Sequence, residues 1–278
     1  MTLRDIDSYP EQEPLSEIGG KYHVRCQELG AGVEGEVFAY GDDPYQEVAV
    51  FPAEKPDGRV LAFMHGGGWT NGYKEWMAFM APAANARGIT FVSVGYRLAP
   101  RVTWPTGVED AAYAIGWIYG NIAEHGGDPD RIVVGGHSAG GHYAMWLAVR
   151  EDWQADAGVP PDVICGAVPV SGVYDFTEGN GMPMRPRFLG DDPSNERDAS
   201  PEHTIARTPP ALISWGDSDF PHLISQAERM VTVYRNAGAD VETLLLEGCD
   251  HLGASYACGE PDGIWIAAVD DWMARNQA

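Results

Sequence analysis

The stretch Gly-Gly-His-Ser-Ala-Gly-Gly, residues Gly135 to Gly141, decides the fold that we predict for this chain of 278 residues. The β-branched run at 132–134 precedes it and predicts a strand, and residues 142–150 continue as a helix. Ser138 therefore occupies a sharp turn between a strand and a helix. Glycines at 136 and 140 remove the Cβ atoms that would clash in such a turn. We expect the Ser138 hydroxyl to point outward at the carboxyl edge of a sheet, where open α/β sheets bind ligands.

The rest of the chain alternates between strand and helix patterns. Strands are expected over residues 35–40, 47–52, 60–64, 89–94, 132–134, 163–170, 211–215 and 241–246, and helices over 75–87, 108–123, 142–150, 221–236 and 263–276. This alternation predicts an α/β fold with a mostly parallel sheet of about eight strands and helices on both faces. Since no break in composition divides the chain, we expect a single domain over residues 1–278.

Two segments fall outside this alternation. Residues 1–35 form an N-terminal arm, whose first 20 residues are polar and predict an irregular stretch or a short helix. Residues 171–210 are rich in proline, glycine and charge. Because this segment is too long for a plain connection, we interpret it as a short cap or pocket wall.

Composition excludes several classes of partner. Eighteen Lys and Arg against 41 Asp and Glu leave a formal net charge of −23, which argues against nucleic acid and anionic membrane surfaces. We see neither a signal peptide nor an apolar run long enough to span a membrane, so a cytoplasmic location is expected. None of the four cysteines shows C-x-x-C spacing, which argues against zinc and redox motifs. Cys249 and Cys258 flank a loop, where we favour free thiols over a disulfide.

A second glycine-rich stretch, His65-Gly-Gly-Gly-Trp69, directly follows the strand expected at 60–64. Three consecutive glycines let the backbone turn its N–H groups toward a ligand without side chains in the way. Two of these donors, together with the amide of Ala139, could bind the oxyanion of a tetrahedral intermediate. The alternative is a purely structural loop.

A serine hydroxyl needs a base, and among the eight histidines His251 is the best placed. It follows the strand expected at 241–246, near the end of the chain. An imidazole acting as base needs a carboxylate to set its tautomer. Asp219, on the bend after the strand expected at 211–215, is favoured. The alternatives are Asp217, which also suits a local turn, and Asp175, while Asp250 is interpreted as a surface charge.

Together these motifs resemble the α/β-hydrolase superfamily of serine hydrolases over roughly residues 36–270. The stretch Tyr96-Arg-Leu-Ala-Pro100 with Glu109-Asp110 downstream is similar to the hormone-sensitive-lipase-like esterases. Ser171-Gly-Val-Tyr-Asp175 and the His-Gly-Gly-x-Trp loop resemble the kynurenine formamidase (arylformamidase) branch. The formamidase loop often carries a larger residue where this chain has Gly68, so the triple glycine follows the esterases.

This resemblance implies the α/β-hydrolase fold and assigns roles to particular residues. Ser138 is the implied nucleophile, His251 the base and Asp219 the orienting acid. The implied oxyanion donors are the amides of Gly67, Gly68 and Ala139. Neither a metal nor an organic cofactor is implied.

The expected function is hydrolysis of a small-to-medium carboxylic ester, or of an aryl amide or formamide, through an acyl-enzyme. A specific arylformamidase and an acyltransferase are the alternatives. A non-catalytic binding protein is disfavoured because it needs no complete Ser, His and Asp set. We expect an apolar, aromatic pocket and no nucleic-acid or membrane partner, and a homodimer is left open. The residues expected to contact the substrate are Trp69, Tyr174, Phe220 and His137.

Overall fold

The computed structural model describes residues 3–177, 179, 182–184 and 186–276. Its strands are β1 (Glu36–Ala39), β2 (Glu47–Phe51), β3 (Gly58–Met64), β4 (Thr90–Val94), β5 (Gly127–His137), β6 (Ile164–Val170), β7 (Ala211–Gly216) and β8 (Val241–Leu246). Its α-helices are α1 (Glu17–Leu29), α2 (Ala81–Asn85), α3 (Thr106–Asn121), α4 (Ala139–Val149), α5 (Ser194–Asp198), α6 (Pro221–Asn236), α7 (His251–Ala257) and α8 (Ile264–Asn276). The 3-10 helices are η1 (Ile6–Ser8), η2 (Lys74–Met80), η3 (Ile122–His125), η4 (Met182–Met184) and η5 (Pro201–His203).

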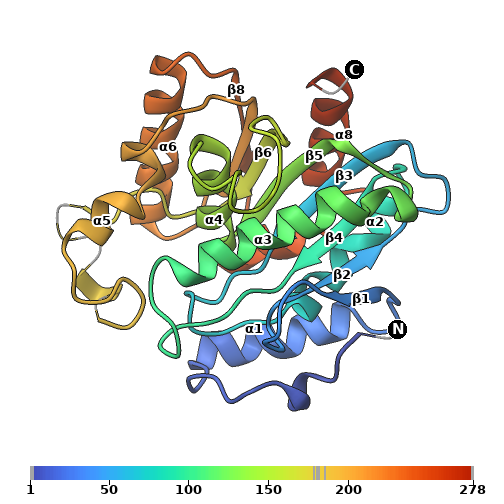
Figure 1. Cartoon of the computed structure of the whole chain (residues 1–278), viewed down its shortest axis with the longest axis horizontal. Coiled ribbons are helices and arrows are strands. Elements are labelled where there is room, and N and C mark those ends of the chain that lie inside the picture. The colour runs from blue at the N-terminus through green and yellow to red at the C-terminus, as the bar shows by residue number, and fades with distance from the viewer. Residues whose placement is uncertain (1–2, 178, 180–181, 185, 277–278) are drawn as a thin grey trace.

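The eight strands form one sheet in the order β1-β2-β4-β3-β5-β6-β7-β8 (Figure 1). The pairs β1–β2 and β2–β4 are antiparallel, and all pairs from β4 to β8 are parallel. The mostly parallel α/β sheet predicted from the sequence is therefore confirmed. Strand β5 lies inside the sheet between β3 and β6. Ser138, which follows β5 at the carboxyl edge of the sheet, is therefore far from both edge strands.

Both faces of the sheet are covered, which follows from the continuous apolar character of its inner strands. In β3, Val60, Ala62 and Met64 join one core cluster, while Leu61 and Phe63 join the other. Helices α3, α4 and α6 contribute to the first cluster, and α1, α7 and α8 contribute to the second (Figure 1). The two-residue period of the strand thus separates two layers of helices.

The prediction of a single helix over residues 75–87 is wrong. The chain forms the 3-10 helix η2 and then the short helix α2, with Pro82 in its first turn. Proline has no N–H to donate to the carbonyl of residue 78, so an α-helix running through this position would lose a hydrogen bond. Helix α7 is a further difference, because no helix was expected directly after β8.

The N-terminal arm contains a regular helix, α1, and is fastened to the body of the protein by buried charges. Lys74 is 1 % exposed, and its Nζ lies 2.8 Å from a Glu47 oxygen and 2.7 Å from a Glu75 oxygen. From the arm, Arg4 pairs with Glu47, and the Tyr9 hydroxyl donates to Glu75 at 3.0 Å. The contacts with Arg4 and Lys74 outweigh the effect of burial, which alone would raise the pKa of Glu47, and hold that pKa below its usual range. This network places the start of the chain beside η2.

Cys249 and Cys258 are free thiols, as favoured from the sequence. Within the described part of the chain, no helix is long and apolar enough to cross a membrane.

Candidate active site

Ser138 sits in a strained turn between β5 and α4. Its φ of 56° and ψ of −117° lie outside the regions that side-chain-bearing residues usually adopt. A Cβ on Gly136 would lie 2.2 Å from the Gly140 carbonyl oxygen, and one on Gly140 would lie 2.1 Å from that of Met64. The Ser138 amide donates to the carbonyl of Val170 at 3.0 Å. The packing around both glycines therefore enforces the sharp turn.

Three side chains from the ends of three strands form one hydrogen-bonded line. The His251 Nε2 lies 3.0 Å from the Ser138 Oγ, and its Nδ1 lies 2.9 Å from the Asp219 Oδ1. Ser138 follows β5, Asp219 follows β7, and His251 follows β8 as the first residue of α7. The structure thus brings together the serine, histidine and aspartate singled out from the sequence.

The contacts of Asp219 keep its side chain in the ionised, carboxylate form. It is 5 % exposed, and its Oδ1 also accepts the Phe220 amide at 2.6 Å. Burial alone would raise its pKa, but the contact with His251 outweighs burial and holds the pKa of Asp219 below its usual range. A carboxylate at this position accepts Nδ1–H, which leaves the lone pair of Nε2 facing the Ser138 hydroxyl.

The other carboxylates considered from the sequence have different contacts. Asp217 is exposed, and its Oδ1 accepts the amide of Gly248 and the hydroxyl of Ser218, as a turn residue does. Asp175 binds Thr177 and, at 2.9 Å, Arg229. Asp250, interpreted from the sequence as a surface charge, is the N-cap of α7 and accepts the Gly253 amide at 2.7 Å.

The loop after β3 carries three consecutive residues with left-handed backbone conformations. The φ values are 119° at Gly67, 60° at Gly68 and 63° at Trp69. A Cβ on Gly67 would lie 2.0 Å from the Asn71 carbonyl oxygen, so this position requires glycine. Among the described residues, the amides of Gly67, Gly68 and Ala139 donate to no other group. Ala139 begins α4, where helix geometry leaves amides free and the helix dipole is positive.

Two buried histidines anchor this loop. The ring of His65 stacks on Tyr96 with centroids 4.2 Å apart, and the Tyr96 hydroxyl donates to the His65 carbonyl. The Trp69 indole donates to the His142 Nδ1 at 3.1 Å, and the His142 Nε2 donates to the Ala199 carbonyl at 2.6 Å. Burial lowers the pKa of His65 to about 4 and that of His142 to about 3. Both rings are therefore neutral structural connectors.

His137 contacts the main chain of the histidine in the hydrogen-bonded line. Its Nε2 donates to the His251 carbonyl at 2.8 Å, and the two ring centroids lie 4.6 Å apart. The Nδ1 edge lies against Gly66, where a Cβ would be 3.0 Å away. Burial, together with the neighbouring His251, lowers the pKa of His137 to about 3. The ring thus lies between the glycine loop and the start of α7.

A pocket of about 270 Å³ opens at Ser138. Its lining combines α1, the glycine loop and α7: Leu15, Ser16, Ile18, Gly19, Tyr22, Gly67, Gly68, Asn71, Trp76, His137, Ser138, His251 and Leu252. Sequence reasoning missed the whole contribution of α1. The signal was the spacing of Ile18 and Tyr22, which lie four residues apart and so share one face of α1, with the apolar Leu15 just before the helix.

The aromatic residues expected around the substrate occupy three different environments. Trp69 stacks on Phe188 with centroids 4.3 Å apart, toward the 171–210 segment. Phe220 is 46 % exposed, and its ring lies 5.0 Å from that of His251, at the rim of the site. Tyr174 is fully buried in the core and is absent from the lining of this pocket. Its expected contact with substrate is corrected accordingly, since the chain after β6 turns this ring inward.

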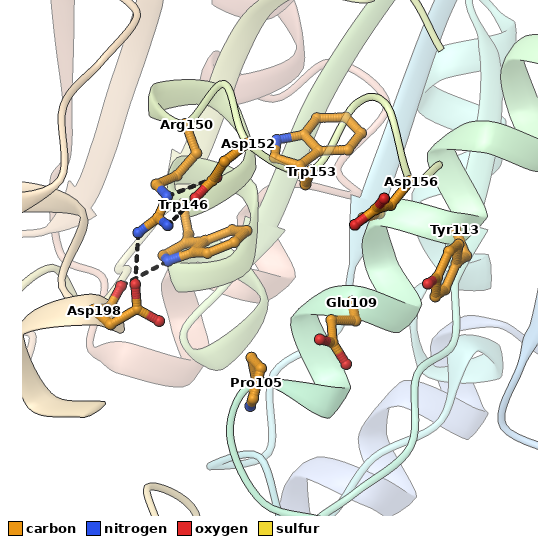
Figure 2. A pocket seen from close by; sticks show the side chains of 10 residues that line it. Pro105, Glu109, Tyr113, Trp146, Arg150, Asp152, Trp153, Asp156 and Asp198 are labelled. Atoms are coloured by element: carbon orange, nitrogen blue, oxygen red, sulfur yellow. Dashed lines mark hydrogen bonds and ion pairs between the residues drawn. The ribbon is translucent and has the colours of Figure 1, made fainter. Parts of the chain in front are cut away.

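A second pocket, of about 210 Å³, shows how the 171–210 segment is joined to α4 (Figure 2). Arg150 pairs with Asp152 and, at 2.7 Å, with Asp198, and its guanidinium lies 4.7 Å from the centre of the Trp146 ring. The Trp146 indole donates to the Asp198 carbonyl at 2.8 Å. These contacts fix α5 against α4. Neither Ser138, His251 nor Asp219 lines this second pocket.

The sheet order, the turn at Ser138 and the line from Ser138 to Asp219 define an α/β hydrolase. The alpha/beta hydrolase fold family matches residues 61–254, and the chain belongs to this family. Among the described residues, no group of three or more His, Cys, Asp or Glu side chains is arranged to hold a metal ion.

Curated relatives include several esterases. The chain is 32 % identical to "Esterase LipQ" of Mycobacterium tuberculosis over 65 % of this chain and 46 % of the relative. It is 41 % identical to "Carboxylesterase NlhH" of the same organism over 57 % of this chain and 45 % of the relative. A "Probable isoprenylcysteine alpha-carbonyl methylesterase ICMEL1" of Arabidopsis thaliana is 28 % identical over 76 % of this chain and 49 % of the relative. The chain spans about half the length of these relatives.

Solved structures share the fold. A hyperthermophilic esterase from Pyrobaculum calidifontis matches with a TM-score of 0.74 and 22 % identity, over 94 % of this chain and 92 % of that one. A truncated carbohydrate esterase from gut microbiota matches with a TM-score of 0.74 and 20 % identity, over 88 % of this chain and 98 % of that one.

Proposed function

We propose that this protein is a serine hydrolase that cleaves small-to-medium carboxylic esters through an acyl-enzyme. The observation that carries the proposal is the line from Ser138 Oγ to His251 Nε2 at 3.0 Å and from His251 Nδ1 to Asp219 at 2.9 Å. Free amides at the glycine loop and at Ala139 support it. The names of the esterase relatives support the same class of reaction.

In the first half of the reaction, the Ser138 Oγ attacks the ester carbonyl carbon while His251 Nε2 takes the hydroxyl proton. The carbonyl oxygen becomes an oxyanion and accepts hydrogen bonds from the amides of Gly67, Gly68 and Ala139. Asp219 stabilises the imidazolium that forms. As the carbon–oxygen bond to the alcohol breaks, His251 returns the proton to the leaving oxygen, and the acyl group remains on Ser138.

In the second half, water takes the place of the alcohol. His251 accepts a proton from this water as its oxygen attacks the acyl carbon, and the same amides hold the second oxyanion. Collapse of the intermediate breaks the bond to Ser138, whose oxygen regains the proton from His251. The products are one alcohol and one carboxylic acid, and removal of one oxyanion donor is expected to slow the rate by about 10²–10³-fold.

The size of the pocket favours compact substrates. At about 270 Å³ it lies just below the usual range for small-molecule sites, and Leu15, Ile18, Trp76 and Leu252 give it apolar walls. An arylformamide would be cleaved by the same nucleophile and amides. Rates on p-nitrophenyl acetate, a long-chain ester and N-formylkynurenine separate these substrate classes, and product analysis with added alcohol separates hydrolysis from acyl transfer.

The test is the hydrolysis of p-nitrophenyl acetate by the intact protein and by Ser138→Ala. We expect kcat to fall by at least about 10³-fold in this variant, since loss of the nucleophile removes the covalent route. The matched control is Ser218→Ala, an exposed serine beside Asp219 that is expected to retain full activity. Full activity in Ser138→Ala would overturn the proposed function.

A further inference from the structure

Helix α1 carries an apolar face with one gap. Gly19, Tyr22 and Cys26 follow one another at spacings of three and four residues, which places them on the same face of α1, and Leu15, just before the N-cap Ser16, lies against Gly19. Tyr22 and Cys26 are buried in the core. Gly19 stands where this pattern calls for an apolar side chain, although glycine is a poor helix former.

Contacts of Tyr22 hold α1 against the body of the protein one turn after Gly19. The Tyr22 hydroxyl and the Ser255 hydroxyl are 2.7 Å apart, and the Tyr22 ring lies edge-on to Trp76 with centroids 5.2 Å apart. At the start of the helix, the N-cap Ser16 Oγ accepts the Gly19 amide at 3.1 Å, which fixes the first turn.

Gly19 belongs to the pocket that contains the nucleophile. Gly19 lines the same pocket as Ser138 and the amides of Gly67 and Gly68. A Cβ added at Gly19 would already meet the Leu15 side chain and the Ser16 Oγ at 3.3 Å, a close contact, so a larger side chain here would displace Leu15 or extend into the pocket. At the mouth of the pocket, Leu15 is 37 % exposed and Ile18 is 57 % exposed. An apolar chain entering the gap would cover this surface, which favours its binding.

We propose that Gly19 is a specificity-determining residue, because its missing side chain leaves room beside Ser138 for an apolar chain of several carbons on the substrate ester. This inference rests on the proposed function and adds the kind of substrate group that the site accepts. A larger side chain at position 19 fills the space and restricts the enzyme to shorter esters.

Gly20 provides a matched control on the same helix. A Cβ at this position would meet no atom within 4 Å, and Gly20 does not contribute to the lining of the pocket. Gly19→Leu and Gly20→Leu therefore make the same change in composition and in helix propensity. Only the first places its side chain at the pocket.

The experiment measures kcat/KM for p-nitrophenyl acetate, butyrate and hexanoate, and for acetates of methanol, butanol and hexanol. Each methylene that is buried is worth about fourfold in kcat/KM. In one of the two series, we expect the unaltered protein to favour the six-carbon over the shortest ester by more than tenfold. Gly19→Leu should reduce this ratio at least tenfold, and Gly20→Leu should leave it within twofold. The responding series identifies the acyl or the alcohol side.

Labelling of Ser138 by a fluorophosphonate separates the two ways to fail. If the unaltered protein is neither labelled nor active, the proposed function fails and this inference fails with it. If the protein is labelled and active but Gly19→Leu keeps the original ratio in both series, the inference alone is overturned. An equal change in Gly19→Leu and Gly20→Leu overturns it as well, because the effect would then come from the helix and not from the pocket.

Discussion

His137 allows a sharp test of how the site is held together. Its Nε2 donates to the His251 carbonyl at 2.8 Å from a side chain that is 1 % exposed. His137→Leu removes the donor from the partly buried His251 carbonyl, which costs about 1–3 kcal/mol. Because that carbonyl belongs to the base, we expect the loss to displace His251 from Ser138. Returning His251 to its aligned position during the reaction then costs up to the same free energy, which at about 1.4 kcal/mol per factor of ten corresponds to a fall in kcat of up to about 100-fold.

His137→Gln is the matched variant, since the amide nitrogen of glutamine reaches the same position as Nε2. We expect it to recover most of the activity that leucine loses, with KM for p-nitrophenyl acetate nearly equal in all three proteins. The assay is steady-state hydrolysis, with urea unfolding of each variant as the control for stability. If leucine and glutamine both raise KM and leave kcat unchanged, His137 binds substrate, as expected from the sequence, and the positioning argument is refuted.

The remaining predictions concern stability. The three buried histidines of the site, whose pKa values are lowered to about 3 or 4, stay neutral when folded, whereas the unfolded chain binds protons near pH 6.5. As the pH is lowered from 6.5, the free energy of unfolding should therefore decrease by about 1.4 kcal/mol per pH unit for each histidine. Equal urea midpoints at pH 7.5 and 5.5 would contradict this. Gly140→Ala, with its Cβ 2.1 Å from a carbonyl oxygen, should unfold at lower urea concentration and lose activity, whereas Gly120→Ala, in open space on α3, should gain about 0.5–1 kcal/mol; equal midpoints for the two variants would refute the packing argument. Lys74→Met leaves the buried Glu75 without a cation and Glu47 with Arg4 alone. It should cost about 3–5 kcal/mol, with faster proteolysis of residues 3–29, and an unchanged cleavage rate there would count against the anchoring network.

Much of the fold, and the positions of Ser138, His251 and Asp219, could be predicted because the decisive sequence signals are local. The turn at Ser138 needs glycines two residues away on each side, and that need is visible in the sequence. Asp219 and His251 follow apolar runs of strand length, and the carboxyl ends of parallel strands meet at one edge of a sheet. Local pattern and topology together favoured these three side chains, with Asp217 and Asp175 left open as alternatives to Asp219, and the resemblance to the α/β hydrolases assigned their roles.

The features that were missed depend on contacts between distant segments. The wall formed by α1 requires packing between Tyr22 and Ser255, 233 residues apart, which no local pattern encodes. Tyr174 was expected at the substrate because it follows a strand, but the direction of a side chain after a strand end depends on the path of the loop. The helix expected at 75–87 failed because the cost of Pro82 was overlooked.

The central claim is that Ser138 is a nucleophile activated by His251. Its most direct test is the intact mass of the protein after incubation with a fluorophosphonate, followed by peptide mapping. We predict a single adduct on Ser138, with no adduct in Ser138→Ala and much slower labelling in His251→Ala. An adduct that persists in folded Ser138→Ala, or labelling that is equally fast without the imidazole, would contradict the account.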